Sequence, residues 1–185
     1  MVKKQSNKSG FTIIEVVLVL AIAGLIFLMI FIAWPALART QRDSQRRDDI
    51  SVFLKKVKDY QTNNRGALPE GLATDVDYED MDYDSAAYNR FSWSGFYHDY
   101  LGETFKDPSG SYYKFDVVKC LAGGGSAGTE CMESSIVTDA DEFGTDMKVI
   151  LQATCGDSKP VATNNPRRIA VQYKLEGGGV YCANT

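Results

Sequence analysis

The 185-residue sequence contains one histidine, His98, and its four cysteines include no Cys-x-x-Cys pair. It also contains no P-loop, no dinucleotide-binding glycine motif and no nucleophile elbow. Histidine and closely spaced cysteines supply most zinc ligands in proteins, so this composition disfavours a zinc site. We interpret His98, which lies among aromatic residues, as a packing or surface residue. The sequence therefore predicts neither an enzyme nor a bound cofactor.

Charge is almost absent between Phe11 and Leu37, where Glu15 is the only charged residue. As a helix this run would be about 40 Å long, and about 20 apolar residues suffice to cross a bilayer. The run is apolar on all sides, so it has no face meant for water. It is expected to lie in lipid or among similar helices. A carboxylate at Glu15 is costly there unless it lies near the interface or has a partner.

A short basic leader precedes this run and ends at Gly10, directly before Phe11, and Glu15 is the fifth residue after Gly10. The arrangement resembles the start of a type IV prepilin. The resemblance implies that a prepilin peptidase cuts after Gly10 and methylates the new N-terminus at Phe11. It also implies that Glu15 pairs with the terminal amine of a neighbouring subunit. The implied partners are other copies of this chain, the pilus assembly platform and minor pilins.

Three other interpretations of the run compete with this one. It could be an ordinary signal peptide cut near Ala36–Ala38, a plain single-span anchor with Glu15 at the interface, or a run whose glutamate has no role. A cleaved signal peptide usually has an apolar region of about 7–15 residues, which is much shorter than this one. Lysines before the helix fit a cytoplasmic N-terminus. We therefore expect a single-pass protein of the cytoplasmic membrane that later enters an extracellular pilus.

Two residues inside the apolar run have consequences for its backbone, Gly24 and Pro35. Glycine weakens a helix and allows close packing, and proline interrupts the hydrogen-bond ladder. In pilins a glycine and a proline bound the part of the helix that melts on assembly. Pro35 lies three residues beyond the commonest proline position of that family. Ordinary use of glycine and proline in membrane helices is the alternative interpretation.

An apolar stripe returns at helical spacing after the run, and it predicts a helix that continues into a globular domain. The stripe consists of Ile50, Phe53, Leu54, Val57 and Tyr60. Asn63–Gly66 is a stop signal, so we expect one nearly continuous helix over residues 11–64. Between the two parts, residues 39–49 contain no apolar side chain. Their arginines are expected to meet lipid headgroups, acidic groups of a neighbouring subunit, or only solvent: Arg39, Arg42, Arg46 and Arg47.

The rest of the chain has the pattern of an α+β domain. A short helix is expected over residues 94–101, and strands over residues 111–118, 147–153, 168–175 and 180–182. The resulting fold is a long N-terminal hydrophobic helix packed on a C-terminal antiparallel sheet of three to four strands, as in pilins. We expect these segments in order: leader 1–10, apolar helix 11–38, amphipathic half of the helix 39–66, connecting αβ-loop 67–110, and sheet with a disulfide-bounded end 111–185.

The four cysteines fit disulfides in an exported domain. Cys120 and Cys131 flank a glycine-rich loop, and Cys155 and Cys182 flank the last hairpin. This placement favours the pairs Cys120–Cys131 and Cys155–Cys182. Four cysteines allow three pairings, and the spacing alone leaves the other two open.

Six carboxylates fall within ten residues between Asp75 and Asp84. Asp75, Asp77 and Glu79 are calcium candidates, although the segment lacks the glycine and the distal glutamate of an EF-hand loop. A solvated acidic loop is the alternative. The net charge of −4 would become −7 when the three lysines of the leader are removed, which argues against general nucleic-acid binding. Arg167, Arg168 and Lys174 are the scattered cations that could touch DNA.

We predict a structural subunit of a type IV pilus that serves adhesion, twitching motility or DNA uptake. A minor pilin or a type II secretion pseudopilin would have the same chemistry on a shorter filament. A membrane-anchored extracellular binding domain that does not polymerise is the alternative from another class of function.

Overall fold

The computed structural model describes residues 10–76, 89–120, 128, 130–131, 136, 146–157 and 159–185. The chain divides into two compact units, Met1–Arg39 and Thr40–Thr185. Helix α1 (Ile13–Asn63) contributes to both units, and it contains Pro35 without a break in its helical assignment. The long helix predicted over residues 11–64 is therefore confirmed.

The first unit consists of the apolar part of α1. Every large apolar side chain between Phe11 and Leu37 is exposed, by 47% or more. Among the described residues α1 is the one helix long and apolar enough to cross a membrane. Soluble monomers rarely expose a continuous apolar surface of this extent, so this surface requires a cover of lipid or of other chains.

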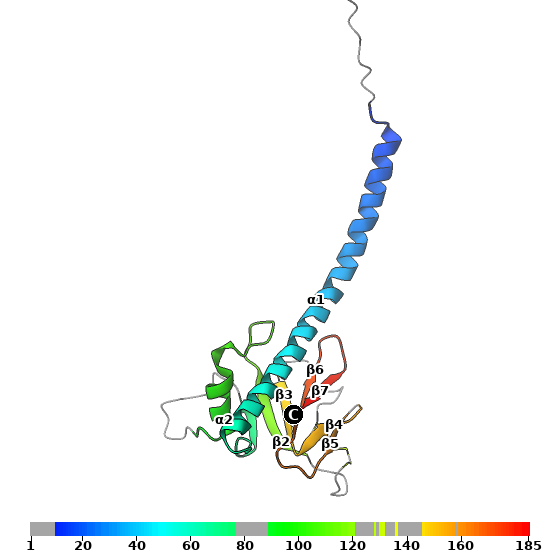
Figure 1. The fold of residues 1–185 in the computed structure, drawn as a ribbon. Coiled ribbons are helices and arrows are strands. Elements are labelled where there is room, and N and C mark those ends of the chain that lie inside the picture. The colour runs from blue at the N-terminus through cyan, green and yellow to red at the C-terminus, as the bar shows by residue number, and fades with distance from the viewer. Residues whose placement is uncertain are drawn as a thin grey trace, which may run out of the picture. The chain divides into compact units, whose positions relative to one another are not determined.

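In the second unit the later part of α1 packs across a five-stranded sheet (Figure 1). The predicted stripe is buried as expected, with Ile50, Phe53 and Val57 fully excluded from solvent. These side chains share one core with inward-facing residues of three strands: Phe115, Val117, Met147, Val149, Val171 and Tyr173. The α+β class predicted from the sequence is confirmed.

The sheet has the order β1-β2-β3-β6-β7, in which β1 and β7 are the edges. Its strands are β1 (Ala73–Val76), β2 (Lys114–Lys119), β3 (Asp146–Leu151), β6 (Ile169–Lys174) and β7 (Val180–Asn184). Strands β3, β6 and β7 form an antiparallel meander, in which Val149 lies opposite Val171 and Tyr173 opposite Tyr181. The four strands predicted from the sequence all occur, with shifted ends.

The prediction of a purely antiparallel sheet of three to four strands is wrong in one pairing and in the strand count. Strand β2 pairs with β3 in parallel, from Lys114 opposite Asp146 to Lys119 opposite Leu151. A parallel pair needs a crossover of a dozen residues or more, and the chain between Lys119 and Asp146 is long enough to supply it. That connection also contributes Cys131 and Ile136 to a second small core, which includes Ile150 and Ala170 of the sheet.

Strand β3 ends two residues earlier than the predicted strand over residues 147–153. Gln152 has a positive φ of 57°, which redirects the chain after Leu151. The following residues form a separate two-stranded sheet, β4 (Ala153–Cys155) with β5 (Pro160–Ala162). Nothing in the residue type at position 152 predicted this turn, because glutamine rarely adopts a left-handed backbone.

The segment between α1 and β2 contributes more to the core than a connecting loop would. It forms helix α2 (Trp93–Phe96), a π-helical turn (Tyr97–Leu101) and a 3₁₀ turn (Gly102–Thr104), which confirms the short helix predicted over residues 94–101. The ring of Phe53 lies 5.7 Å from that of Phe96 and 5.5 Å from that of Phe115. Edge-to-face pairs of this kind add to the stability gained by burial.

We predict that Phe53→Ala lowers the free energy of unfolding of the second unit by about 3–5 kcal/mol, because it opens a cavity under α1. Val52→Ala is the matched control, since Val52 is the next residue of the same helix and is 47% exposed. Its effect should stay within about 0.5 kcal/mol. Urea unfolding of the full chain in detergent, followed by near-ultraviolet circular dichroism, measures both. Equal effects of the two substitutions would contradict the assignment of the buried face.

Candidate functional site

The apolar helix begins in a capping box formed by Thr12 and Glu15. Residues 10–12 precede the helix, which starts at Ile13, so Thr12 is the N-cap. The Thr12 backbone N–H donates to Glu15 Oε2 at 2.9 Å, and the Glu15 backbone N–H approaches Thr12 Oγ1 at 3.4 Å. The Thr12 hydroxyl also donates to Glu15 Oε2 at 2.7 Å. Two N–H groups that lack helical partners are thus satisfied reciprocally.

Thr12 is a functional candidate that the sequence analysis missed. The available signal was the Thr-x-x-Glu spacing directly before an apolar run, which is typical of a helix start. Both bonds to the carboxylate end on Oε2, and among the described residues Oε1 of Glu15 accepts none. Glu15 is therefore anchored by one oxygen and presents the other. Its negative charge also suits the N-terminal end of a helix, where the helix dipole is positive.

The residues expected to be processed lie immediately before this cap. Gly10 and Phe11 are outside the helix, and both are exposed, Phe11 by 91%. A Cβ at Gly10 would meet no atom within 4 Å, so no neighbouring group of the described chain covers this site. Cleavage between Gly10 and Phe11 stays a prediction. The first residues of the chain, 1–9, lie outside the described part.

Gly24 and Pro35 both lie within α1, and the helix continues through each of them. A Cβ added at Gly24 would meet no atom within 4 Å, so this glycine leaves a small notch in an otherwise bulky apolar surface. Such a notch lets a second helix approach closely. The role of the two residues in local melting stays a prediction.

The arginines between the apolar run and the core stripe do not form one solvated row. The side chain of Arg46 is 2% exposed, and its Nη2 lies 3.0 Å from Oδ2 of the equally buried Asp107. Its Nη1 lies 3.1 Å from Asp43 and 3.2 Å from Glu176, and Arg42 binds Glu176 through two nitrogens. The expectation that this row meets lipid or a neighbouring subunit is therefore wrong for Arg46, because acidic groups of its own domain surround it.

This ion network joins α1 to two turns of the second unit, Thr40–Thr185, which we call the head. Asp43 accepts hydrogen bonds from the backbone N–H groups of Glu176 and Gly177 in the β6–β7 turn, at 2.9 and 2.7 Å. Asp107 lies in the turn before β2, where it also accepts from Ser109. A buried charge that loses its partner is strongly destabilising, so Arg46 fixes both turns against the helix.

The network lowers the pKa values of two carboxyl groups, Glu176 and Asp107. Hydrogen bonds from Arg42, with a smaller contribution from Arg46, lower the pKa of Glu176 to about 2. Burial alone would raise the pKa of Asp107, but hydrogen bonds from Ser109 and Arg46 outweigh it and leave the pKa below its ordinary value. Both groups are therefore ionised at neutral pH, where they pair with Arg42 and Arg46.

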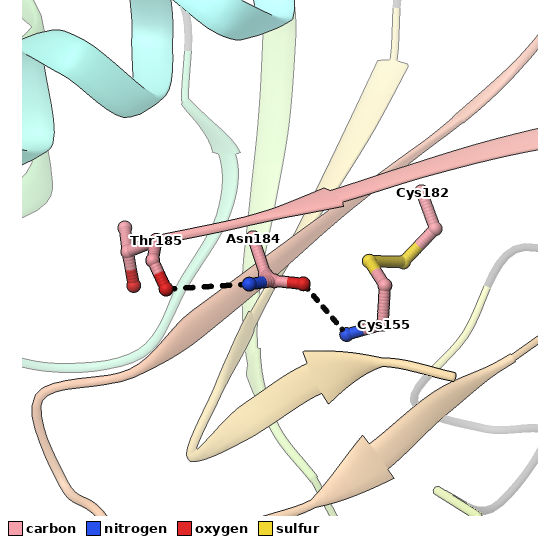
Figure 2. Close-up of a disulfide and its surroundings, with 4 residues drawn as sticks. All are labelled: Cys155, Cys182, Asn184 and Thr185. Carbon is pink, nitrogen blue, oxygen red and sulfur yellow. Dashed lines mark hydrogen bonds between the residues drawn. A yellow bond between two sulfur atoms is a disulfide. The ribbon is translucent and has the colours of Figure 1, made fainter. Parts of the chain in front are cut away.

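The cysteines form the pairs Cys120–Cys131 and Cys155–Cys182, with Cα–Cα distances of 5.2 and 5.9 Å. Figure 2 shows the second pair, which links the small sheet to the edge strand β7. Asn184 reinforces this link, because its Oδ1 accepts a hydrogen bond from the backbone N–H of Cys155 at 3.1 Å.

The calcium candidates fall largely outside the described part of the chain. Asp77 and Glu79 lie outside the described residues, as does the side chain of Asp75. His98 is half-buried and lies 3.0 Å from Asp99, its neighbour in the chain. Over the described ranges, no group of three His, Cys, Asp or Glu side chains is arranged to hold a metal ion.

A family model described as the prokaryotic N-terminal methylation motif matches residues 5–31. This motif is the leader signature of type IV prepilins. The match spans the leader and much of the apolar run, and it ends before the head. Neither the curated proteins nor the solved structures contain a match to this chain.

We predict that Thr12→Val weakens the first turn of α1, because valine keeps the shape but removes the capping hydroxyl. The loss should be about 1 kcal/mol, which corresponds to roughly fivefold faster amide hydrogen exchange at residues 13–16 in detergent micelles. Ser44→Ala is the control, since Ser44 Oγ donates to the Thr40 carbonyl in the interior of the same helix. Unchanged exchange in Thr12→Val would show that the capping box contributes nothing.

Acid should weaken the head through Glu176. Folding lowers the pKa of this carboxyl from 4.5 to about 2, so the unfolded chain takes up the proton first as the pH falls. Its stabilising effect is complete above about pH 4.5 and is lost between pH 4.5 and 2. Glu176→Gln should lower the free energy of unfolding at pH 7 and reduce its dependence on pH in that window. Urea unfolding at pH 7 and pH 3 measures this, with the exposed Glu70→Gln as control.

Proposed function

We propose that this chain is a prepilin that is cleaved after Gly10 and assembles into a filament of the type IV pilus class. The observation that carries the proposal is the methylation motif of residues 5–31 at the start of a helix whose large apolar side chains between Phe11 and Leu37 are all exposed. The motif points to a structural precursor of the pilin or pseudopilin kind rather than to an enzyme. The exposed helix supplies a surface that a polymer would cover.

Processing would create the group that Glu15 needs. Hydrolysis of the bond after Gly10 leaves an amine on Phe11, and methylation keeps that amine basic and positively charged. A positive charge at a helix N-terminus is unfavourable beside the helix dipole, and a carboxylate nearby offsets it. Glu15, which holds Thr12 through Oε2, would offer Oε1 to the amine of a neighbouring copy. Both charges would then be satisfied away from water.

The same arrangement suits a subunit that waits in the cytoplasmic membrane before assembly. The apolar part of α1 would span the bilayer with the basic leader inside and the head outside. Transfer from lipid to a bundle of similar helices changes little in hydrophobic free energy, so close packing and the Glu15 pair would decide assembly. Gly24 would assist by admitting a neighbouring helix. Two disulfides in the head fit a compartment that is oxidising.

A major pilin, a minor pilin and a type II secretion pseudopilin share this mechanism and differ in the length of the filament. A membrane-anchored binding domain would share the helix but would not need Glu15 to reach the cell surface. The substitution Glu15→Ala therefore separates the polymerising proteins from a simple anchor.

We predict that material sheared from the cell surface consists of chains that start at Phe11, carry one added methyl group and contain two disulfides. Intact mass and N-terminal sequencing measure all three properties. A chain that starts at Met1 would indicate an uncleaved anchor, and one that starts near Arg39 a secreted domain. Either of these would contradict the proposal.

Glu15→Ala should abolish sheared filaments while cleavage after Gly10 continues, since the substitution removes the docking carboxylate and not the cleavage site. Glu70→Ala is the matched control, because Glu70 is an exposed carboxylate of the head. Electron microscopy of sheared material and immunoblots of membranes measure filament and precursor separately. Filaments of normal length from Glu15→Ala would contradict the proposed docking.

A further inference from the structure

The head carries a basic pocket at the end of α1, where β6 begins and β7 ends. Its volume is about 370 Å³. The pocket is lined by Lys58, Gln61, Asn165, Arg167, Arg168 and Thr185. Three of these six residues are cations and none is an acidic side chain. We call this site the basic pocket.

The cations of the basic pocket differ from the arginines near the start of the head. Arg42 and Arg46 are neutralised by carboxylates of their own chain, as described above. In the part of the chain that the structure describes, no side-chain carboxylate lies within salt-bridge distance of Lys58, Arg167 or Arg168. Arg168 is partly neutralised by the terminal carboxylate of Thr185, so Lys58 and Arg167 carry most of the exposed positive charge. A concentrated positive charge on a chain of net charge −4 attracts an anionic group.

The pocket is held in shape by backbone contacts. Gln61 Nε2 donates to the Arg167 carbonyl at 2.8 Å, which ties the loop before β6 to α1. The Arg167 guanidinium occupies the space beside Gly66, where a Cβ would lie 3.0 Å from its Cζ. A site whose charges are positioned in advance binds a ligand at a lower cost in conformational entropy.

The opposite wall is fixed through the end of β7. The Thr185 backbone N–H donates to the Ile169 carbonyl at 3.1 Å, and Arg168 donates to the terminal carboxylate of Thr185. Figure 2 shows how Asn184 bonds both Thr185 and the backbone of Cys155, beside the disulfide to Cys182. The second disulfide therefore supports the wall of the basic pocket as well as the strand.

We propose that the basic pocket binds the acidic segment, residues 75–84, of a second copy of this chain, so that heads pair by charge in the filament. This inference rests on the proposed function, because a homopolymer brings a pocket and an acidic segment from different copies together. The segment supplies six carboxylates in ten residues, the opposite sign to the three cations. The net negative charge of the mature chain repels a free polyanion as it approaches the pocket. A neighbouring copy is also acidic, but in a filament the packing of its helix would hold it close to the pocket.

The first variant reverses the pocket, by Lys58→Glu, Arg167→Glu and Arg168→Glu together. It should reduce sheared filaments about tenfold, because several exposed ion pairs each contribute a factor of a few to subunit affinity. The matched control reverses three exposed lysines outside the pocket and changes the net charge equally: Lys106, Lys119 and Lys159. This control should assemble normally. Intact mass with both disulfides and urea unfolding verify that each variant folds.

The second variant reverses the segment, by Asp77→Lys, Glu79→Lys and Asp80→Lys together, and should assemble as poorly as the first. When the two variants are expressed in one cell, the negative pocket of the first can pair with the basic segment of the second, and the positive pocket of the second with the acidic segment of the first. Filaments that contain both chains, identified by mass, would then reappear. This restoration is the expected result.

Three results would overturn the inference. Restoration only when both reversals are in the same chain would mean that the pocket and the segment pair within one copy. If every combination fails to assemble, the pocket binds an anion that does not come from this chain. If the pocket variant forms normal filaments, the pocket binds no anion that assembly requires. The last result does not affect the proposed function if wild-type filaments still depend on Glu15. If the wild-type chain forms no filaments, both the proposed function and the pairing of the heads are overturned.

Discussion

The structure depends on one constraint, which is that the apolar surface of α1 between Phe11 and Leu37 has no cover of its own. Its large side chains are all exposed, and only lipid or other apolar helices can remove them from water. The single charged group in that surface is placed at the first turn, where Thr12 holds it. The apolar part of the helix can therefore lie in a membrane or in a bundle of similar helices. A pair between Glu15 and the N-terminal amine of a neighbouring copy would form only in the bundle.

The head is built so that the later part of α1 is fixed firmly to the sheet. Ile50, Phe53 and Val57 pack into the main core, and Arg46 joins the helix to the β6–β7 turn and to the turn of Asp107. Glu176 and Asp107 are ionised at neutral pH, so the ion pairs that hold this part of the helix are present there.

The main elements could be predicted from the sequence because they depend on local periodicity. The stripe from Ile50 to Tyr60, the helix near Trp93 and the four longest strands all have patterns that the residue types impose. The parallel pairing of β2 with β3 depends on how a long connection crosses the sheet, and the turn at Gln152 depends on its surroundings. The burial of Arg46 could not be predicted either, because its partners lie far away in the chain. Thr12 could have been found, since a Thr-x-x-Glu spacing is local.

The central claim is that copies of this chain cover the apolar surface of α1 for one another. Photo-crosslinking of the full chain in cells, with a benzophenone side chain at Leu25, tests it most directly. The account predicts a ladder of dimers, trimers and higher species in sheared material, and its disappearance when Glu15 is replaced by alanine. Crosslinks to lipid alone, with monomers on the cell surface and no effect of Glu15, would contradict the account.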